Sequence, residues 1–270
     1  MNVVLLCAFN EEAVIRPTLL AVHRALGGGP EPLRVVLVDD GSSDATVAEA
    51  RRAVEETGGA LDLEIVSHAR NRGLGAALVT GFDACLAMAA DGDAIVTLDA
   101  DNTHPPRLIP TLLARLDEGY ELVIASRYQP GASVRGVPRS RLLISDGARF
   151  LLRAVFPIRG VRDYTCCFRA YRPAALRRAL SAFGDELTSA RGFEAVMDIL
   201  LRLRATGVRA CEVPIELEYE TRVGSSKMKV LATIRKTLAL IARRRLEAFT
   251  VDRPSAVRAR LAAATRGARP

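Results

Sequence analysis

The chain has 270 residues, of which 49% are hydrophobic and 26% charged, as is ordinary for a globular protein with a sizeable core. Its net charge of +7 favours anionic partners such as phosphates, nucleic acid or an acidic lipid surface. The five cysteines lack a C-x-x-C spacing, which argues against a disulfide framework or a zinc knuckle and favours a reduced, cytoplasmic protein. The start of the chain does not resemble a signal peptide, and no apolar run approaches the ~18 residues that span a membrane.

Short apolar runs alternate with amphipathic segments through the first half of the chain. The apolar runs predict strands over residues 3–9, 34–40, 63–68, 94–101 and 121–127, and the amphipathic segments predict helices over 11–26, 44–57, 73–90 and 105–117. Strands and helices that alternate in this way indicate an α/β fold, with a mostly parallel sheet flanked by helices on both faces.

The second half begins with a loop over residues 128–146, which is rich in Gly, Pro, Ser and Arg. The pattern then predicts helices over 141–155 and 192–206, a strand over 209–217 and a basic amphipathic helix over 227–248. We therefore expect a catalytic domain at residues 1–220, a basic loop and amphipathic helix at 221–250, and a disordered tail at 251–270.

Polar clusters follow the first four predicted strands. The clusters are AFNEE after the first strand, DDGSSD after the second, NRGLG after the third and DADNTH after the fourth. Because open parallel sheets bind ligands at the carboxyl ends of their strands, all four clusters are expected on one rim.

The D-x-D pair of Asp99 and Asp101 is the first candidate for chemistry. They are expected on an extended segment, where side chains alternate with period two, so both carboxylates lie on the same side and can face one ligand. Their oxygens suit Mg²⁺ or Mn²⁺, which proteins often hold together with substrate phosphates. The alternative is a simple turn, in which Asp99 or Asn102 caps the helix that follows Pro105.

The DDGSSD cluster also has two interpretations. Asp39 and Asp40 could accept hydrogen bonds from a nucleobase or a ribose, whereas Gly41 would form the turn and Ser43 or Asp44 would cap the next helix. NRGLG is not the G-x-G-x-x-G fingerprint, and an acidic turn argues against a Rossmann dehydrogenase. Of the three histidines, His104 is a candidate for a site role beside the D-x-D, while His23 and His68 are expected to be surface or packing residues.

The ordered series of motifs is similar to one family. AFNEE, VDDGSSDAT, NRGLGAA, LDADNTHPP and ASRY resemble the inverting family 2 glycosyltransferases of GT-A fold, in the dolichol-phosphate mannose synthase-like branch. The resemblance continues through DYTCCFRAYRP and VPIELEYETRVGSSKM, and covers roughly residues 2–240. Each motif alone is weak, but the ordered series is specific.

The resemblance implies roles for particular residues. It implies a nucleotide-sugar donor site lined by Cys7, Phe9, Glu11, Leu37, Asp39, Asp99 and Ala100, with donor phosphates at Arg222 and Lys227. It implies a metal site of Asp99, Asp101 and Thr103, with Asp101 as the principal ligand. Acceptor phosphates would bind Arg127 and Arg141, and the catalytic residues would be Asp101, Arg127 and Glu194.

Three departures from the family pattern bear on these roles. Cys7 and Phe9 stand where the family usually has Pro and Tyr, which weakens any inference about the nucleobase. Thr103 stands where a Gln or Ser often helps to hold the metal. Many hydroxyl-using relatives carry an E-D pair where this chain has Gly192-Phe193-Glu194.

The acceptor decides whether a base is needed. A polyprenyl phosphate, with a second pKa of about 6, is already anionic near neutral pH, whereas a hydroxyl acceptor of a soluble enzyme needs a general base such as Glu194. The missing aspartate favours the phosphate acceptor. A nucleotidyltransferase should carry a Gly-rich basic loop after its first strand, where this chain has Asn10-Glu11-Glu12, and a non-catalytic nucleotide-sugar binding module is the remaining alternative. Nucleic-acid binding is not expected, since the strand ends are acidic and Trp is absent.

The C-terminal helix is strongly basic. Between Arg222 and Arg245 there are eight basic residues and no acidic residue. Leu231, Ile234, Leu238 and Ile241 form an apolar stripe at helical spacing. The stripe either packs on the catalytic domain or places the helix on an anionic membrane, as a peripheral contact on the cytoplasmic side.

Overall fold

The computed structural model describes residues 1–27, 32–136, 147, 149–218 and 230–250. The strands are β1 (Asn2–Ala8), β2 (Leu33–Asp39), β3 (Leu63–Ser67), β4 (Ala94–Asp99), β5 (Leu122–Ser126), β6 (Ser133–Arg135), β7 (Arg169–Tyr171), β8 (Ala210–Pro214) and β9 (Glu216–Glu218). The helices are α1 (Ile15–Leu26), α2 (Thr46–Glu56), α3 (Leu74–Met88), α4 (Ile109–Asp117), α6 (Pro173–Phe183), α7 (Glu194–Ala205) and α8 (Val230–Thr250), with short 3₁₀ helices at Pro106–Leu108 and Gly184–Leu187.

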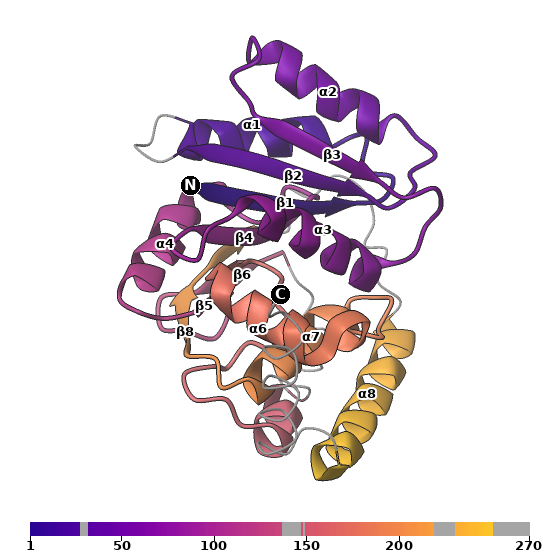
Figure 1. Ribbon diagram of the computed structural model, residues 1–270, viewed down its shortest axis with the longest axis vertical. Helices are drawn as coiled ribbons and strands as arrows, with labels where there is room; N and C mark the ends of the chain where they lie inside the picture. Colours follow the sequence, from indigo (N-terminus) through magenta and orange to yellow (C-terminus); the bar gives the residue numbers. More distant parts are fainter. Residues whose placement is uncertain (28–31, 137–146, 148, 219–229, 251–270) are drawn as a thin grey trace, which may run out of the picture.

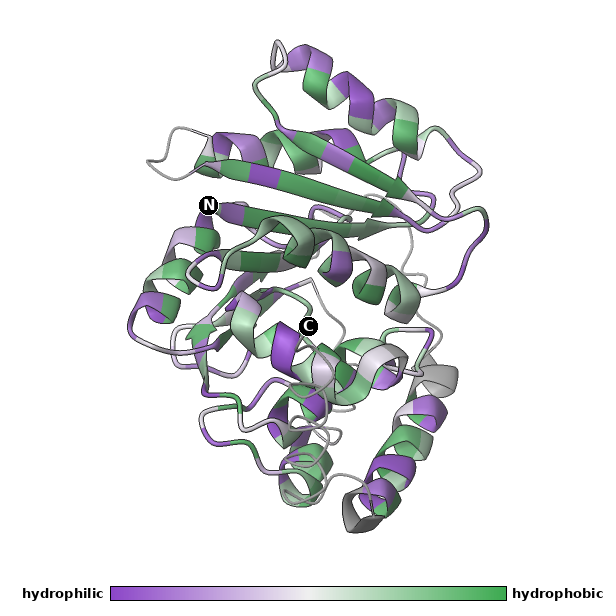
Figure 2. Cartoon of the chain, viewed as in Figure 1, coloured by the Kyte–Doolittle hydropathy of each residue, from purple (hydrophilic) through white to green (hydrophobic). Residues whose placement is uncertain are grey.

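Seven strands form one sheet in the order β3-β2-β1-β4-β7-β5-β8 (Figure 1). Every neighbouring pair is parallel except the two that involve β7. Residues 3–6 of β1 are at most 1% exposed, and since neighbouring residues point to opposite faces, both faces of the sheet are covered. Figure 2 accordingly shows β1 as largely hydrophobic, whereas helices such as α2 and α8 mix hydrophobic and hydrophilic residues. The predicted mostly parallel α/β sheet is confirmed.

Two elements of the first half differ from the predicted boundaries. The predicted helix over 11–26 begins only at Ile15; residues 12–14 form a turn, and the backbone N–H groups of Glu11 and Glu12 donate to the side chains of Thr46 and Asp44. The predicted strand over 94–101 ends at Asp99, and residues 100 and 101 form a turn. The loop after β1 therefore ends later, and the loop after β4 starts earlier, than apolar periodicity indicates.

The sequence pattern missed β7 and α6, and also β6, which lies within the predicted loop over 128–146. β7 has only three residues and runs antiparallel between β4 and β5. Its first residue, Arg169, is completely buried and donates its guanidinium N–H groups to the carbonyl oxygens of Val196 and Tyr164. An arginine in a three-residue strand gives no apolar run, so periodicity alone cannot detect it.

The predicted strand over 209–217 is two strands that separate at Ile215: β8 continues the large sheet, and β9 pairs with β6. Of the predicted helix over 141–155, residues 149–155 are helical, and 137–146 and 148 lie outside the described residues. The tail at 251–270 also lies outside them. Within the described part of the chain, no helix is both long and apolar enough to cross a membrane.

Helix α8 packs on α7 through a face that differs from the predicted stripe. Leu240 and Ile241 are buried, Arg244 is 1% exposed, and Leu238 is 49% exposed. The Arg244 guanidinium donates two hydrogen bonds, of 2.6 and 2.9 Å, to the buried carboxylate of Asp198 on α7. The prediction was wrong at Leu238, because a charged residue with a buried partner occupies the docked face and hydropathy counts such a residue as exposed.

Candidate active site

The loops after β1 and β2 are joined by side-chain hydrogen bonds to backbone groups. Asn10, whose φ is +55°, donates its N–H to Ser42 Oγ (2.9 Å) and accepts from the Ser43 N–H at Oδ1 (2.8 Å). The Glu11 N–H is donated to Thr46 Oγ1 at 2.8 Å. The AFNEE and DDGSSD clusters therefore form one rigid part of the rim, as the parallel sheet predicts.

Asp39 and Asp40 are both buried but have different roles. Asp39 Oδ1 accepts one N–H from the turn that follows it, at 3.1 Å. Asp40 accepts from His68 Nδ1 at 2.7 Å and from the N–H groups of Arg72 and Gly73 at 2.8 and 2.7 Å. The suggestion that Asp40 binds a nucleotide is wrong, because its oxygens hold the loop after β3; His68 is a packing residue, as predicted.

The glycines of NRGLG permit a close approach to the loop before α7. A Cβ on Gly73, whose φ is +94°, would lie 2.4 Å from the Arg191 carbonyl oxygen. A Cβ on Gly75 would lie 1.9 Å from the Ala190 carbonyl oxygen. These glycines therefore serve to bring the third strand end against the segment that carries Glu194.

The D-x-D does not lie on an extended segment. Asp99 ends β4 and Asp101 lies in the following turn, where Asn102 has a φ of +60°. The Asp101 Oδ1 accepts both the N–H (3.2 Å) and the hydroxyl (2.6 Å) of Thr103. The argument from strand alternation was thus wrong. The capping alternative fails as well, since the helix after Pro105 has no side-chain cap.

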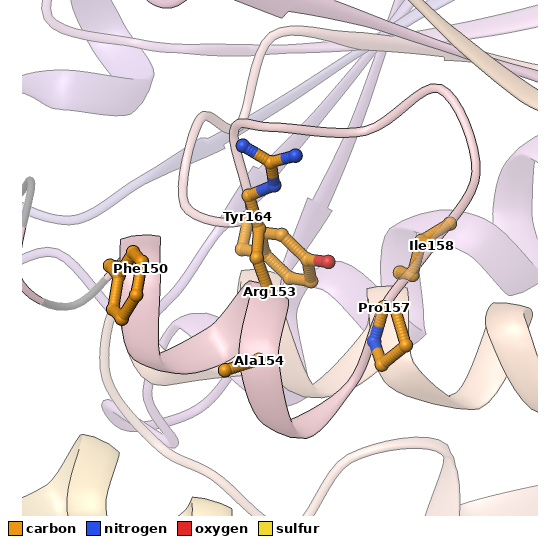
Figure 3. Close-up of a pocket in the computed structure, with 6 residues that line it drawn as sticks. All are labelled: Phe150, Arg153, Ala154, Pro157, Ile158 and Tyr164. Atoms are coloured by element: carbon orange, nitrogen blue, oxygen red, sulfur yellow. The ribbon is translucent and has the colours of Figure 1, made fainter.

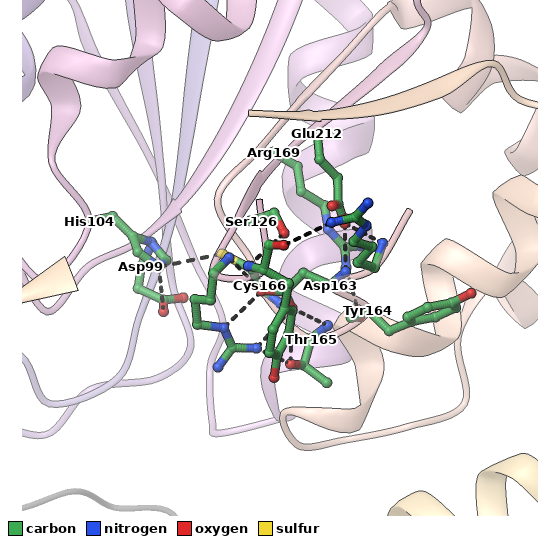
Figure 4. A network of polar contacts seen from close by, with 12 residues as sticks. Asp99, His104, Ser126, Asp163, Tyr164, Thr165, Cys166, Arg169 and Glu212 are labelled. Carbon is green, nitrogen blue, oxygen red and sulfur yellow. Dashed lines mark hydrogen bonds and ion pairs between the residues drawn. The ribbon is translucent and has the colours of Figure 1, made fainter. Parts of the chain in front are cut away.

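His104 is buried beside Asp99 and is part of the network in Figure 4. Its Nδ1 accepts the Asp99 N–H at 3.0 Å, and its Nε2 lies 3.6 Å from Asp99 Oδ2 and 4.0 Å from Cys166 Sγ. The imidazole stacks on Phe168 at a centroid distance of 5.3 Å. His104 therefore has a place at the site.

Arg127 is held by Asp163, a fully buried carboxylate near the end of β5. Its Nε and Nη2 donate to the two oxygens of Asp163, at 2.8 Å each, and its side chain is 19% exposed. Burial by itself would raise the pKa of Asp163, but the Arg127 guanidinium lowers that pKa from its ordinary 3.8 to about 2. Burial would lower the pKa of Arg127, yet Asp163 raises it well above its usual value. Asp163 therefore fixes the orientation of the Arg127 side chain, which is predicted to bind a phosphate.

Glu212 on β8 holds the backbone of this loop. Its Oε1 accepts the N–H groups of Arg162 and Asp163, both at 2.5 Å, and its Oε2 accepts from Gln129 Nε2 at 3.0 Å. Sequence reasoning assigned no role to Asp163 or Glu212. The acidic start of DYTCCFRAYRP was the available signal, but the partner of Asp163 lies 36 residues earlier in the chain.

Glu194 is the first residue of α7, and its side chain is 8% exposed. Its Oε1 accepts the Gly192 N–H at 3.3 Å and lies 3.8 Å from Lys236 Nζ on α8. The side chain thus stands between a loop that touches NRGLG and the C-terminal helix.

The remaining predicted donor residues differ in exposure. Phe9 is 38% exposed at the end of β1, where an aromatic face could stack on a base. Cys7 is half-buried, pairs in register with Asp99, and has a thiol whose pKa burial raises. Leu37 has no exposed surface and Ala100 is 4% exposed. Leu37 belongs to the core, and its contact with a nucleotide stays a prediction.

Three predicted cations, Arg141, Arg222 and Lys227, lie outside the described residues. Their phosphate-binding roles stay predictions. A cavity of about 320 Å³, lined by Phe150, Arg153, Ala154, Pro157, Ile158 and Tyr164, contains none of the predicted site residues (Figure 3).

The acidic rim suits a divalent cation that the substrate helps to hold. Among the described residues no group of three or more His, Cys, Asp or Glu side chains could bind a metal. Asp99 and Asp101 follow the same strand, and the Asp99 side chain is 35% exposed. Two carboxylates completed by phosphate oxygens and water fit Mg²⁺ or Mn²⁺ better than a site made only of protein ligands.

The mostly parallel sheet with this acidic rim has the GT-A fold, which the chain shares with a solved structure. The model of the family described as "Glycosyl transferase family 2" matches residues 3–180 of the sequence. The chain therefore belongs to that family.

Curated relatives and a solved structure agree with this class. The dolichol-phosphate mannosyltransferase of Pyrococcus furiosus is 32% identical over 84% of this chain and 58% of its own length. The polyprenol monophosphomannose synthase of Mycolicibacterium smegmatis is 33% identical over 84% of this chain and 80% of its own. The solved glucosyl-3-phosphoglycerate synthase of Mycobacterium tuberculosis has a TM-score of 0.64 at 22% identity, over 91% of this chain and 79% of its own, a similarity of fold.

Proposed function

We propose that the protein transfers a mannosyl group, with inversion, from a GDP- or UDP-linked sugar to a polyprenyl phosphate. The observation that carries this proposal is the pair Asp99 and Asp101 at the end of β4, beside the loops after β1 and β2. The relatives that are named mannosyltransferases of dolichol or polyprenol phosphates support the sugar and the acceptor.

In this proposal the donor side binds the nucleotide diphosphate. Asp101, oriented by Thr103, and Asp99 would hold Mg²⁺ or Mn²⁺, which would offset the charge that develops on the leaving diphosphate. Phe9 would stack on the base, and Asp39 would accept from the base or the ribose. The rigid loops keep these groups in place before the donor arrives.

The opposite side would bind the acceptor. Arg127, directed by Asp163, would contact the acceptor phosphate together with Arg141, while Arg222 and Lys227 would contact donor phosphates. A phosphate acceptor is already charged and attacks without a base. Glu194 would serve as the base only with a hydroxyl acceptor.

The test is a donor and acceptor screen. Thermal shifts with GDP and UDP sugars in the presence of Mn²⁺ identify the donor, because a ligand of the folded state raises the melting temperature. Turnover is then measured with a short polyprenyl phosphate, the corresponding polyprenol and a soluble saccharide. Product from the phosphate alone supports the proposal. Product from the saccharide alone favours the soluble hydroxyl-using enzyme, and donor binding without any turnover favours a binding module.

Peripheral contact with an anionic membrane belongs to the same proposal. The side of α8 away from α7 exposes Leu238 and Leu246, at 49% and 72%, together with Arg235 and Arg245. An apolar and cationic surface of this kind suits an anionic lipid surface, where each basic residue adds about 1 kcal/mol. Co-sedimentation with anionic liposomes should weaken as salt rises and should weaken in Leu246→Gln; equal recovery with neutral liposomes would contradict the contact.

A further inference from the structure

His104 is oriented by the main chain of the residue whose side chain it faces. Its Nδ1 lies 3.0 Å from the N–H of Asp99, and that N–H can only donate, so Nδ1 must present its lone pair. The hydrogen-bond network therefore assigns the ring proton to Nε2.

The Nε2–H has two neighbours. Asp99 Oδ2 lies at 3.6 Å and Cys166 Sγ at 4.0 Å. A thiol is a weak hydrogen-bond acceptor, whereas a carboxylate is a strong one. The Nε2–H is therefore attracted more strongly to Asp99 than to Cys166.

The imidazole has little freedom to turn away. His104 is 5% exposed, and its ring stacks on Phe168 at an interplanar angle of 25°. The Asp99 side chain, by contrast, is 35% exposed at the rim. The buried ring is thus the fixed partner and the carboxylate is the group that it orients.

We propose that His104 is a positioning residue, which holds the Asp99 carboxylate toward a metal-bound nucleotide diphosphate. In this role His104 contacts neither the metal nor the nucleotide. This inference rests on the proposed function. It also means that His104 is not itself a metal ligand, although it follows the D-x-D closely: Nδ1 accepts from the backbone, and Nε2, which carries the proton, lies 3.6 Å from Asp99 Oδ2 and 4.0 Å from Cys166 Sγ. Partners that orient ligating carboxylates typically matter about 10- to 100-fold for metal affinity.

The chain offers a matched set of variants. His104→Asn keeps a side-chain oxygen near the position of Nδ1 and removes the Nε2–H, and His104→Phe keeps only the stacked ring. His23→Asn, in the last turn of α1, is the control for the same substitution away from the rim. Because the chain has only three histidines, their ring ¹⁵N resonances can be assigned by these substitutions.

Two measurements test the role. In the wild type, ¹⁵N NMR should find Nε2 protonated and Nδ1 unprotonated at His104. Calorimetry with Mn²⁺ and GDP or UDP should give a dissociation constant about 10- to 100-fold weaker in folded His104→Asn and an unchanged one in His23→Asn.

The outcomes separate the two proposals. If the wild type binds neither GDP nor UDP in the presence of Mn²⁺, the proposed function fails. If the wild type binds and folded His104→Asn binds equally well, the positioning role is overturned while the proposed function stands. A proton on Nδ1 of the wild type would overturn the inference even if the variants failed to fold.

Discussion

The two sides of the candidate active site are built from different interactions. On the donor side, backbone N–H groups donate to the side chains of Asn10, Ser42 and Asp39. On the other side, the buried carboxylate of Asp163 accepts two hydrogen bonds from Arg127, and the contact between α7 and α8 repeats this arrangement with Asp198 and Arg244. The donor side thus presents carboxylates at the rim, whereas on the other side the buried carboxylates form ion pairs with arginines.

This difference separates activity from stability. A carboxylate at the rim contributes little to packing, so its loss should affect binding and turnover. A buried carboxylate that loses its charge leaves an unpaired arginine, so its loss should first affect folding.

The largest effect is expected at Asp101. Asp101→Ala should lower kcat/KM about 1000-fold, roughly 4 kcal/mol, because the leaving diphosphate loses its cation. The melting temperature should change little. Asp62→Ala, at an exposed pair with Arg34, is the control. Steady-state kinetics with Mn²⁺ measure the effect, and near wild-type turnover would contradict the metal-binding role.

The next effect is on stability at Asp198. Asp198→Asn should lower the free energy of unfolding by about 3 kcal/mol, because the buried Arg244 then keeps only its ion pair with Glu247. Asp62→Asn should change it by less than about 1 kcal/mol, since the Asp62–Arg34 pair is exposed. Urea unfolding measures both variants. Equal stability of the two variants would contradict the expected difference between a buried and an exposed ion pair.

At acid pH the protein should lose the contribution that Asp163 makes to its free energy of unfolding. The folded-state pKa, about 2, lies below the ordinary 3.8, so the unfolded chain binds the proton more tightly. The stabilisation is present above pH 4 and is lost as the pH falls toward 2, and it amounts to about 2 kcal/mol. Urea unfolding of the wild type and of Asp163→Asn between pH 5 and 2 should differ in slope; parallel curves would contradict the assignment.

The smallest effect is expected from the cations predicted to bind donor phosphates. Arg222→Gln or Lys227→Gln should each lower kcat/KM by the equivalent of one charged hydrogen bond, on the order of 2 kcal/mol. Both lie outside the described residues, so the sequence alone carries this prediction. Unchanged kinetics in both variants would show that the segment does not contact the donor.

Local pattern was sufficient for much of the fold and for the acidic rim. Apolar runs of five to seven residues located β1 to β5, because buried parallel strands need continuous hydrophobicity. The order of the polar clusters then placed Asp39, Asp99 and Asp101 at one edge, since parallel strands end together. Pattern failed at Asp40, whose partners His68 and Arg72 come from a different loop.

The sequence by itself therefore determined the parallel sheet, its acidic edge and the family, because each depends on residues close together in the chain. Only the tertiary structure decided which polar residues hold one another: Asp163 with Arg127, Asp198 with Arg244, and the short strand β7 between β4 and β5. The physical reason is that a buried charge is stable only with a partner, and the 36 and 46 residues that separate these partners carry no periodicity that connects them.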